Sequence, residues 1–295
     1  MHVLITGVGG FIGGRIARAF LAAGWQVTGV RRNRKSSDLM SHPALKIVTT
    51  DLRSCNELPG RFDYLVHCAA DLPSNCPDGE ELYRSNVEGS ARIFDLASKA
   101  GVDRIVYMSS MSVYGTISDP VVDENTHPHN PDNYGKSKAE GEKLVATWAR
   151  NSGRAAVSIR LPGIVGAYGR SNFLCETLQK IIADLPVKAR NPDALFNNIV
   201  YVESLAQFTV NLYKSMPLGH TELTIAANEP QTIRNVIARM YLQAGKSEKI
   251  EWAPDTGTSF LISFDRAESL GYKPETVLNY LDLFVQDTFR ELATI

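Results

Sequence analysis

The residues most able to do chemistry are a tyrosine and a lysine four positions apart, Tyr134 and Lys138, in the segment YGKSK. In a helix this spacing puts both side chains on one face, and Pro131, Asp132 and Asn133 just before them are typical of a helix start. A phenol with a pKa of about 10 transfers protons poorly at neutral pH, but a nearby ammonium group stabilises its anion. The pair therefore predicts a tyrosine that acts as a general acid and base.

Hydroxyl groups cluster earlier in the chain, in the segment MSSMSVYG at residues 108–115. This segment follows an apolar run at 104–108 that predicts a strand. A hydroxyl at such a strand end, from Ser109 or Ser110, can polarise a substrate carbonyl while a tyrosine moves the proton. The alternative is ordinary turn chemistry, for which serine is common at strand ends.

A glycine-rich loop follows the first apolar run, in the segment TGVGGFIG at residues 6–13. Gly7, Gly10 and Gly13 have the GxxGxxG spacing between a predicted strand and a predicted helix, which is the context that a dinucleotide-binding loop requires. The helix that follows would offer unpaired N–H groups and the positive end of its dipole to a pyrophosphate. The alternative is a glycine turn that only packs a helix on a strand.

Four cations stand within five residues after the second apolar run: Arg31, Arg32, Arg34 and Lys35. In a dinucleotide fold an acid at this place binds the ribose 2′-hydroxyl of NAD, whereas arginine accommodates the 2′-phosphate of NADP. A guanidinium fork suits phosphate oxygens. We therefore predict that Arg31 or Arg32 binds the 2′-phosphate and that NADP(H) is preferred, with NAD(H) as the alternative cofactor. A solvated basic loop would also explain the cluster.

The elements that must position these residues alternate along the first 160 residues. Short, β-branched runs with little polar alternation predict strands buried on both faces, at residues 2–6, 26–30, 46–49, 64–67, 104–108 and 156–160. Segments of helical period lie between them, such as 13–23, 80–100 and 134–151. This order predicts an α/β fold with a Rossmann-like, doubly wound parallel sheet, whose ligands bind at the carboxyl ends of the strands.

The pattern is less regular after residue 160. Helices are predicted at 173–183, 232–244 and 276–292, and strands at 197–202 and 222–226. We expect a dinucleotide-binding domain over residues 1–165, with sheet contributions from about 197–226. Residues 166–295 would form mostly a small substrate-binding lobe.

Composition excludes several other classes of protein. The 295 residues carry 31 Lys and Arg against 32 Asp and Glu, a formal charge of −1, with 44% hydrophobic residues. A disordered chain is excluded, and no general basic excess favours nucleic acid or an anionic membrane. The four cysteines form no CxxC pair, and His127 and His129 have no ligand-like spacing, so no metal site is predicted. Without a signal peptide or a long apolar span, the expectation is a reduced, cytoplasmic protein.

Taken together, these motifs resemble the extended short-chain dehydrogenases/reductases of the NAD(P)-dependent epimerase/dehydratase type. The resemblance covers nearly the whole chain and also includes Asp51-Leu52, HCAA at 67–70 and NVEG at 86–89. It implies an enzyme in which Ser110 is the catalytic serine and Tyr134 the acid and base. Lys138 would bind the nicotinamide ribose and lower the tyrosine pKa, and Asn86 would hold a proton-relay water.

The same resemblance implies the cofactor contacts. Asp51 would contact adenine, and Ala69 and Ala70 would line the cofactor. The remaining implied contacts are Gly7, Gly10, Phe11, Ile12, Gly13, Leu52, Cys68, Ser109, Tyr134, Lys138, Pro162 and Ile164.

Departures from the family pattern narrow the reaction. Dehydratases of this type carry an Asp-Glu pair where this chain has Met111 and Ser112, and 3,5-epimerases use a cysteine at Ser112. A 4-epimerase needs only Ser, Tyr, Lys and a retained cofactor, but usually has an acid after the second strand. We therefore expect a ketoreductase that uses NADPH, with the sugar-nucleotide 4-epimerase as the alternative. A non-catalytic NADP(H)-binding regulator is the third reading, although such proteins usually have a broken Tyr/Lys pair.

Substrate identity rests on weaker signals. Family members that handle nucleotide sugars have an asparagine where this chain has Gly163 and an arginine where it has Asn197. Arg170, Lys180 and Arg190 are candidate replacements for the phosphate contact, or ordinary surface residues. We expect a nucleotide-linked 4-keto-6-deoxy sugar first and a smaller aldehyde or ketone second. We also expect a homodimer through the helix that carries YGKSK, for which Leu144, Val145 and Trp148 offer an apolar face; packing within the monomer explains these residues equally well.

Overall fold

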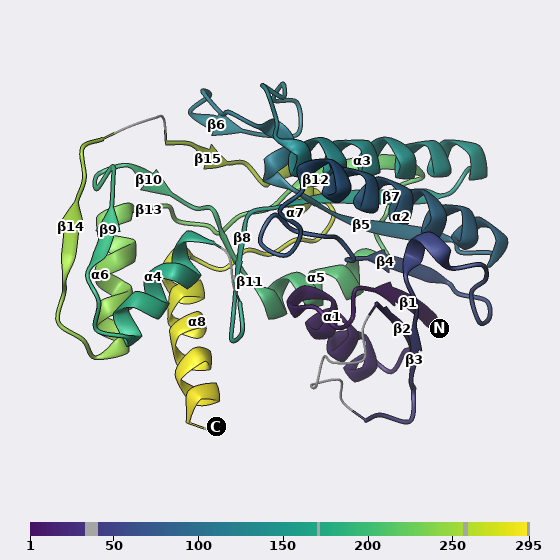
Figure 1. Ribbon diagram of the computed structural model, residues 1–295, viewed down its shortest axis with the longest axis horizontal. Coiled ribbons are helices and arrows are strands. Elements are labelled where there is room, and N and C mark those ends of the chain that lie inside the picture. The colour runs from purple at the N-terminus through teal and green to yellow at the C-terminus, as the bar shows by residue number, and fades with distance from the viewer. Residues whose placement is uncertain (33–40, 170–171, 256–258, 294–295) are drawn as a thin grey trace.

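A seven-stranded parallel sheet forms the middle layer of the right-hand part of the molecule in Figure 1, and its strand order is β12-β7-β5-β4-β1-β2-β3. The computed structural model describes residues 1–32, 41–169, 172–255 and 259–293. The strands are β1 His2–Thr6, β2 Gln26–Arg31, β3 Leu45–Thr49, β4 Tyr64–His67, β5 Arg104–Ser110, β7 Ala155–Leu161 and β12 Gly219–Thr224. The predicted Rossmann-like parallel sheet is confirmed, with strand ends shifted by one or two residues for most of the runs.

Alternate residues of each strand enter two different cores, which explains why the runs are apolar throughout. In β1, Val3 and Ile5 pack into the larger core and Leu4 into the other. In β5 the same alternation sends Val106 into the larger core and Tyr107 into the other. A strand covered on both faces has no polar side to present to water.

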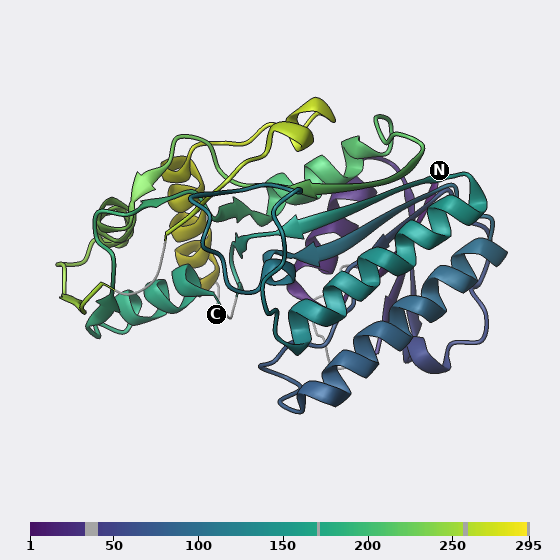
Figure 2. The same cartoon turned by 90° about the horizontal axis from the view of Figure 1, so that it is seen from above.

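Two pairs of helices cover the two faces (Figures 1 and 2). The larger core lies under α1 Phe11–Ala22 and α5 Val202–Leu212, and the other under α2 Gly79–Lys99 and α3 Asn133–Ser152. Val145 and Trp148 of α3 are buried in this second core. Packing within the monomer therefore accounts for these two residues of the apolar face predicted for a dimer interface. A homodimer stays a prediction.

The C-terminal part contributes one strand to the main sheet and forms a lobe beside it (Figure 1). In this part β12 pairs with β7 in parallel, and the other strands make two-stranded sheets. The remaining elements are η1 Leu52–Ser54, η2 Met111–Tyr114, β6 Val121–Val122, β8 Gly163–Val165, α4 Phe173–Ile182, β9 Val187–Ala189, β10 Leu195–Phe196, β11 Ile199–Tyr201, β13 Gln231–Thr232, α6 Ile233–Ala244, β14 Ile250–Trp252, β15 Leu261–Ile262, α7 Asp265–Ser269 and α8 Val277–Leu292. The division at residue 165 into two domains stays a prediction.

Two predicted strands differ in the structure. The strand expected at 222–226 is β12, Gly219–Thr224, which begins three residues and ends two residues earlier. The run at 197–202 contains the short strand β11, Ile199–Tyr201, and its last residue, Val202, already begins helix α5. Val200 and Val202 are both fully buried, so the apolar run continues across the change from strand to helix. An apolar run of this length has no periodicity that separates the two.

None of the helices among the described residues is long and apolar enough to cross a membrane. Within the same part of the chain, no group of three or more His, Cys, Asp or Glu residues is arranged to hold a metal ion.

Candidate active site

The glycine loop forms a cradle at the carboxyl end of β1. Gly7 has a φ of +73°, and a Cβ there would lie 2.8 Å from the backbone nitrogen of Ala69, so only glycine fits the loop against the end of β4. The amide of Gly10 donates to the Gly7 carbonyl at 2.9 Å, and α1 begins at Phe11. Among the described residues, no side chain caps this helix start. Its first N–H groups are therefore open to an anion, and the cradle fits the pyrophosphate of a dinucleotide.

A buried histidine ties β1 to β4 below this cradle. The His67 Nδ1 atom lies 2.6 Å from Thr6 Oγ1 and its Nε2 atom 3.0 Å from Ser90 Oγ. The amide of Ala69 donates to the same threonine hydroxyl at 3.2 Å. Complete burial lowers the pKa of His67 to about 3, so the ring is neutral and acts as a hydrogen-bonded spacer. It fixes the segment that carries Cys68, whose thiol pKa burial raises to about 12.

The structure brings Ser110 and Tyr134 together. Ser110 ends β5, Tyr134 lies in the first turn of α3, and their side chains are hydrogen-bonded. Burial raises the pKa of the Tyr134 phenol to about 12, and the hydrogen bond from Ser110 opposes that rise. The serine hydroxyl also lies 3.1 Å from Ser112 Oγ and accepts the Ser112 amide at 3.1 Å. Ser110 is therefore held in place from both sides.

Lys138 lies one turn further along α3 and is buried against β5. Its Nζ donates to the Met108 carbonyl at 2.8 Å and lies 5.7 Å from the centre of the Tyr134 ring. Burial lowers the pKa of this lysine to about 8. The close approach of α3 to β5 depends on Gly141, where a Cβ would lie 2.8 Å from Tyr107 Cε1 and closer still to its hydroxyl.

Asn86 is buried on α2 and its amide group is engaged with its neighbours. Its Oδ1 accepts the Asp71 amide at 2.7 Å, and its Nδ2 donates to the Asp71 carbonyl and to Ser137 Oγ, each at 3.1 Å. Ser137 in turn donates to the Tyr134 carbonyl at 2.8 Å. Asn86 thus links the loop after β4 to the first turn of α3. Its proton-relay role stays a prediction.

A buried ion pair lies under the predicted catalytic residues, and the sequence-based predictions do not include it. Glu142, four residues after Lys138, accepts Arg160 Nε at 3.0 Å and Nη2 at 2.8 Å. The Ser109 hydroxyl donates to the same carboxylate at 2.6 Å, so it turns into the core and any cofactor contact of Ser109 would use its backbone. Arg160 also donates to Tyr114 Oη at 2.8 Å. The i, i+4 spacing from Lys138 is the signal that places Glu142 on the same face of α3.

A second ion pair lies at the predicted ribose end of the site. Arg32 Nη1 and Nη2 donate to the two carboxylate oxygens of Asp71 at 3.0 and 2.8 Å. This pairing raises the pKa of Arg32. Burial alone would raise the pKa of Asp71, but the hydrogen bonds from Arg32 and Ser85 and the nearby arginine charges together lower it. Arg31 ends β2, and its carbonyl accepts the Thr50 amide at 2.9 Å. Arg34 and Lys35 lie outside the described residues, and the NADP(H) preference stays a prediction.

The other expected cofactor contacts follow the ends of β1, β3, β4 and β7. Asp51 caps η1 by accepting the Arg53 amide at 2.9 Å, and Leu52 begins that turn. Pro162 separates β7 from β8, which contains Ile164. Ile12 and Gly13 lie in the first turn of α1, and Ala70 follows β4.

The two departures that bear on the substrate have structural roles. Asn197 is buried and bonds to both backbone groups of Ile262, donating to its carbonyl at 2.8 Å and accepting its amide at 2.9 Å. It therefore holds β15 and is not directed at a ligand. A Cβ at Gly163 would lie 2.9 Å from the Asn198 carbonyl oxygen. Of the candidate replacements, Lys180 lies on α4 and Arg190 follows β9, and Arg170 is outside the described residues.

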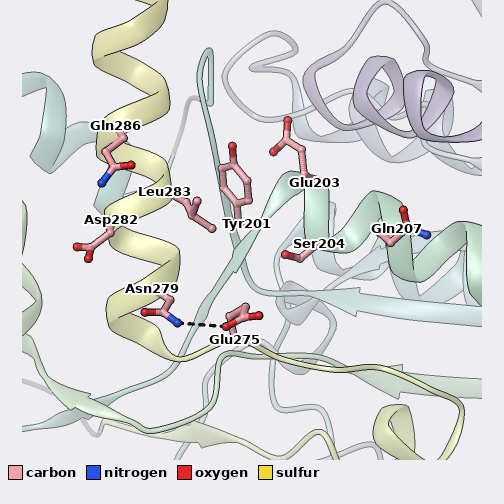
Figure 3. Close-up of a pocket in the computed structure, with 9 residues that line it drawn as sticks. All are labelled: Tyr201, Glu203, Ser204, Gln207, Glu275, Asn279, Asp282, Leu283 and Gln286. Carbon is pink, nitrogen blue, oxygen red and sulfur yellow. Dashed lines mark hydrogen bonds between the residues drawn. The ribbon is translucent and has the colours of Figure 1, made fainter. Parts of the chain in front are cut away.

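A separate hollow of about 650 Å³ lies between α5 and α8 (Figure 3). The residues that line it are Tyr201, Glu203, Ser204, Gln207, Glu275, Asn279, Asp282, Leu283 and Gln286. None of them is a predicted site residue. Three of them are acids, so the lining is unsuited to the phosphates of a nucleotide.

Comparison with known proteins shows the family of the chain. Residues 3–208 match the NAD dependent epimerase/dehydratase family. The chain belongs to this family. The match confirms the resemblance to the extended dehydrogenases/reductases and, at the level of the family, the prediction of an NAD(P)-dependent enzyme.

Individual relatives are more distant. The chain is 27% identical over 224 residues to the N-acetyl-alpha-D-glucosaminyl-diphospho-ditrans,octacis-undecaprenol 4-epimerase of Escherichia coli O157:H7. That alignment covers 74% of this chain and 65% of the relative's length. A UDP-glucose 4-epimerase of Thermotoga maritima, solved with UDP-glucose, superposes with a TM-score of 0.84 at 18% identity over 99% of this chain and all of that one. A UDP-glucose 4-epimerase of Thermus thermophilus, solved with NAD, gives 0.80 at 21% identity over 98% and 99%. At these identities the structures show the shared fold.

Proposed function

We propose that the protein is an NAD(P)-dependent 4-epimerase of a nucleotide sugar. The observation that carries the proposal is the grouping of Ser110, Tyr134 and Lys138 at the end of β5 and the start of α3. A bound dinucleotide would supply the hydride acceptor and donor. The names of the relatives, which include 4-epimerases of nucleotide-linked and lipid-linked sugars, support the substrate class.

The chain's own groups can move the proton that accompanies such a hydride. Tyr134 takes the proton from the sugar C4 hydroxyl and later returns it to the same oxygen after the sugar has presented its other face. Ser110 hydrogen-bonds the phenol and can polarise the C4 oxygen. Lys138 holds a positive charge 5.7 Å from the centre of the Tyr134 ring, and an ammonium group near a phenol can stabilise the phenolate.

The residues after Ser110 favour oxidation and reduction over elimination or 3,5-epimerisation. Met111 and Ser112 form η2 where an acid pair or a cysteine would serve elimination or 3,5-epimerisation. Without those groups, removal of water lacks its acid and base. A 4-epimerase requires none of them.

A second candidate is an NADPH-dependent ketoreductase of a nucleotide-linked 4-keto-6-deoxy sugar, or of a smaller aldehyde or ketone. The presence of Arg31 at the end of β2 and of Arg32 directly after it supports this candidate, because arginine at this position of a dinucleotide fold can accommodate a 2′-phosphate. A reductase releases its oxidised cofactor after each turnover, whereas an epimerase ends with the cofactor it began with.

The deciding experiment adds NAD and follows UDP-glucose, UDP-galactose and UDP-N-acetylglucosamine, each deuterated at C4, by proton NMR of the remaining ring protons, which distinguish the C4 epimers. An epimerase interconverts the C4 epimers, keeps deuterium at C4 and causes no net change in NADH absorbance. A reductase instead oxidises NADPH in stoichiometric amounts with a 4-keto-6-deoxy sugar. If the protein showed neither activity, with the UDP-sugars or with the 4-keto-6-deoxy sugar, the result would contradict the proposal.

Tyr134→Phe tests the assigned role of the phenol. Loss of a group that transfers the proton should lower turnover by at least about 100-fold, with the dissociation constant for the dinucleotide unchanged within about twofold. The matched control is Tyr83→Phe, which removes an exposed phenol on α2. Turnover retained in Tyr134→Phe would contradict the assignment.

A further inference from the structure

The Arg32–Asp71 ion pair spans the carboxyl end of β1. Arg32 directly follows β2, Asp71 lies four residues beyond the end of β4, and these two strands flank β1 on either side. The glycine cradle begins at this same strand end. In a dinucleotide fold the adenosine half of the cofactor leaves the cradle toward β2. The pair therefore stands where the adenosine ribose would pass.

The two partners are held very differently. The Asp71 carboxylate also accepts the Ser85 hydroxyl at 2.8 Å, and Asn86 binds both backbone groups of Asp71. Its side chain is 9% exposed, whereas that of Arg32 is 57% exposed. The carboxylate is thus a fixed negative charge, and the guanidinium is the partner with room to exchange.

We propose that Asp71, by engaging Arg32, selects the cofactor at the ribose end and favours a 2′-hydroxyl over a 2′-phosphate. A 2′-phosphate would have to draw Arg32 away and would then lie beside a fixed, uncompensated carboxylate. A 2′-hydroxyl adds no charge and can donate to a carboxylate, so Asp71 would do from β4 what an acid after β2 does in NAD-binding sites. The inference rests on the proposed function only because it requires that a dinucleotide binds at the glycine cradle.

The test measures dissociation constants for NADH and NADPH by fluorescence titration of the full chain, without any sugar. Asp71→Asn removes the negative charge and frees Arg32, so the ratio of the NADPH constant to the NADH constant should fall about tenfold or more. Arg32→Gln leaves the carboxylate uncompensated, so the same ratio should rise. The two substitutions thus move one ratio in opposite directions, which a general loss of structure does not do.

Two further variants complete the experiment. Asp282→Asn is the matched control, because Asp282 makes a comparable two-point contact with Arg239 between α8 and α6, with Nε donating to Oδ1 at 2.7 Å. It should leave the ratio unchanged. Ser85→Ala loosens the carboxylate without removing it and should lower the ratio by less than Asp71→Asn, which keeps the inference testable if the latter does not fold.

The outcomes separate this inference from the proposed function. The inference would be overturned if the ratio of the two dissociation constants in Asp71→Asn stayed within about twofold of the wild-type ratio. If that variant does not fold, the same result in Ser85→Ala would overturn it. Either result would leave the epimerase proposal intact. Failure of the wild-type protein to bind either dinucleotide would overturn both.

Discussion

The proposed cofactor site has an arginine–carboxylate pair at each end, Arg160–Glu142 and Arg32–Asp71, and the two pairs differ in burial. At the catalytic end, Arg160 and Glu142 are 11% and 8% exposed, and Arg160 has further bonds to Tyr114 Oη and to the Glu124 carbonyl. At the ribose end, Arg32 extends into solvent while Asp71 is fixed. Both arginines reach both oxygens of their carboxylate. The same chemical pair thus serves in one place as a fixed support and in the other as a contact that a ligand can replace.

The difference follows from where each pair lies in the fold. Glu142 and Arg160 lie between α3 and the end of β7, under the residues that would transfer the proton. A buried charge depends on each of its partners, because loss of one partner leaves the charge uncompensated and shielded from water, which destabilises the fold. Separation of a solvent-exposed arginine from its partner costs little free energy, since water and salt ions compensate the arginine charge.

The largest expected effect is at the buried pair. Glu142→Gln should lower the free energy of unfolding by about 3–5 kcal/mol, because it leaves the Arg160 charge uncompensated. Urea unfolding measures this change. Glu140→Gln is the control, since Glu140 lies on the same helix and pairs with Lys143 at the surface; its effect should stay within about 0.5 kcal/mol. Equal effects of the two substitutions would remove the distinction between the two kinds of pair.

An intermediate effect is expected from His67, on the buried side of the site. Its pKa is about 3 in the folded protein and about 6.5 in an unfolded chain. The unfolded state therefore binds the extra proton as the pH falls below about 6.5, and the free energy of unfolding should fall toward pH 3 by up to about 1.4 kcal/mol per pH unit from this group alone.

The measurement for His67 is the slope of stability against pH between 6.5 and 4. His67→Asn should give a flatter slope than the wild-type protein, whatever its absolute stability. His127→Asn, at an exposed loop position, should leave the slope unchanged. Parallel slopes for wild type and His67→Asn would show that this histidine does not couple folding to pH.

The smallest expected effect is at the ribose end. Arg32→Gln should lower the free energy of unfolding by only about 1 kcal/mol, because the arginine is solvated and the Asp71 carboxylate that it leaves, although only 9% exposed, keeps the hydrogen bond from the Ser85 hydroxyl. Urea unfolding at low and at high salt measures it, and the small loss should shrink further in high salt. A loss as large as that of Glu142→Gln would mean that the Arg32–Asp71 pair supports the fold and cannot exchange partners freely.

Much of the site was accessible from sequence because its parts are local. The glycine spacing after β1, the serines at the end of β5 and the four-residue interval from Tyr134 to Lys138 each declare themselves within a few residues. The periodicity of the first 160 residues likewise predicts the parallel sheet, since buried strands and amphipathic helices have distinct patterns.

The remaining parts depend on contacts between distant segments. Asp71 is 39 residues from Arg32, and nothing local relates a loop acid after β4 to the end of β2. Glu142 shares a helix face with Lys138, but its partner Arg160 comes from another strand. Asn197 occupies a position at which the family pattern has an arginine, and only its two bonds to Ile262 reveal that it is part of the internal structure.

The strand β12 has a consequence for how the protein is made. It completes the sheet beside β7, with Gly219 paired to Ala155, although the residues of the proposed active site lie earlier in the chain. A chain emerging from the ribosome therefore carries Ser110, Tyr134 and Lys138 well before the edge of β7 is covered. Parallel pairing across so long an interval is slow to form. Until Thr224 has been synthesised, the edge of β7 is unpaired, and the nascent chain is prone to aggregate through this edge.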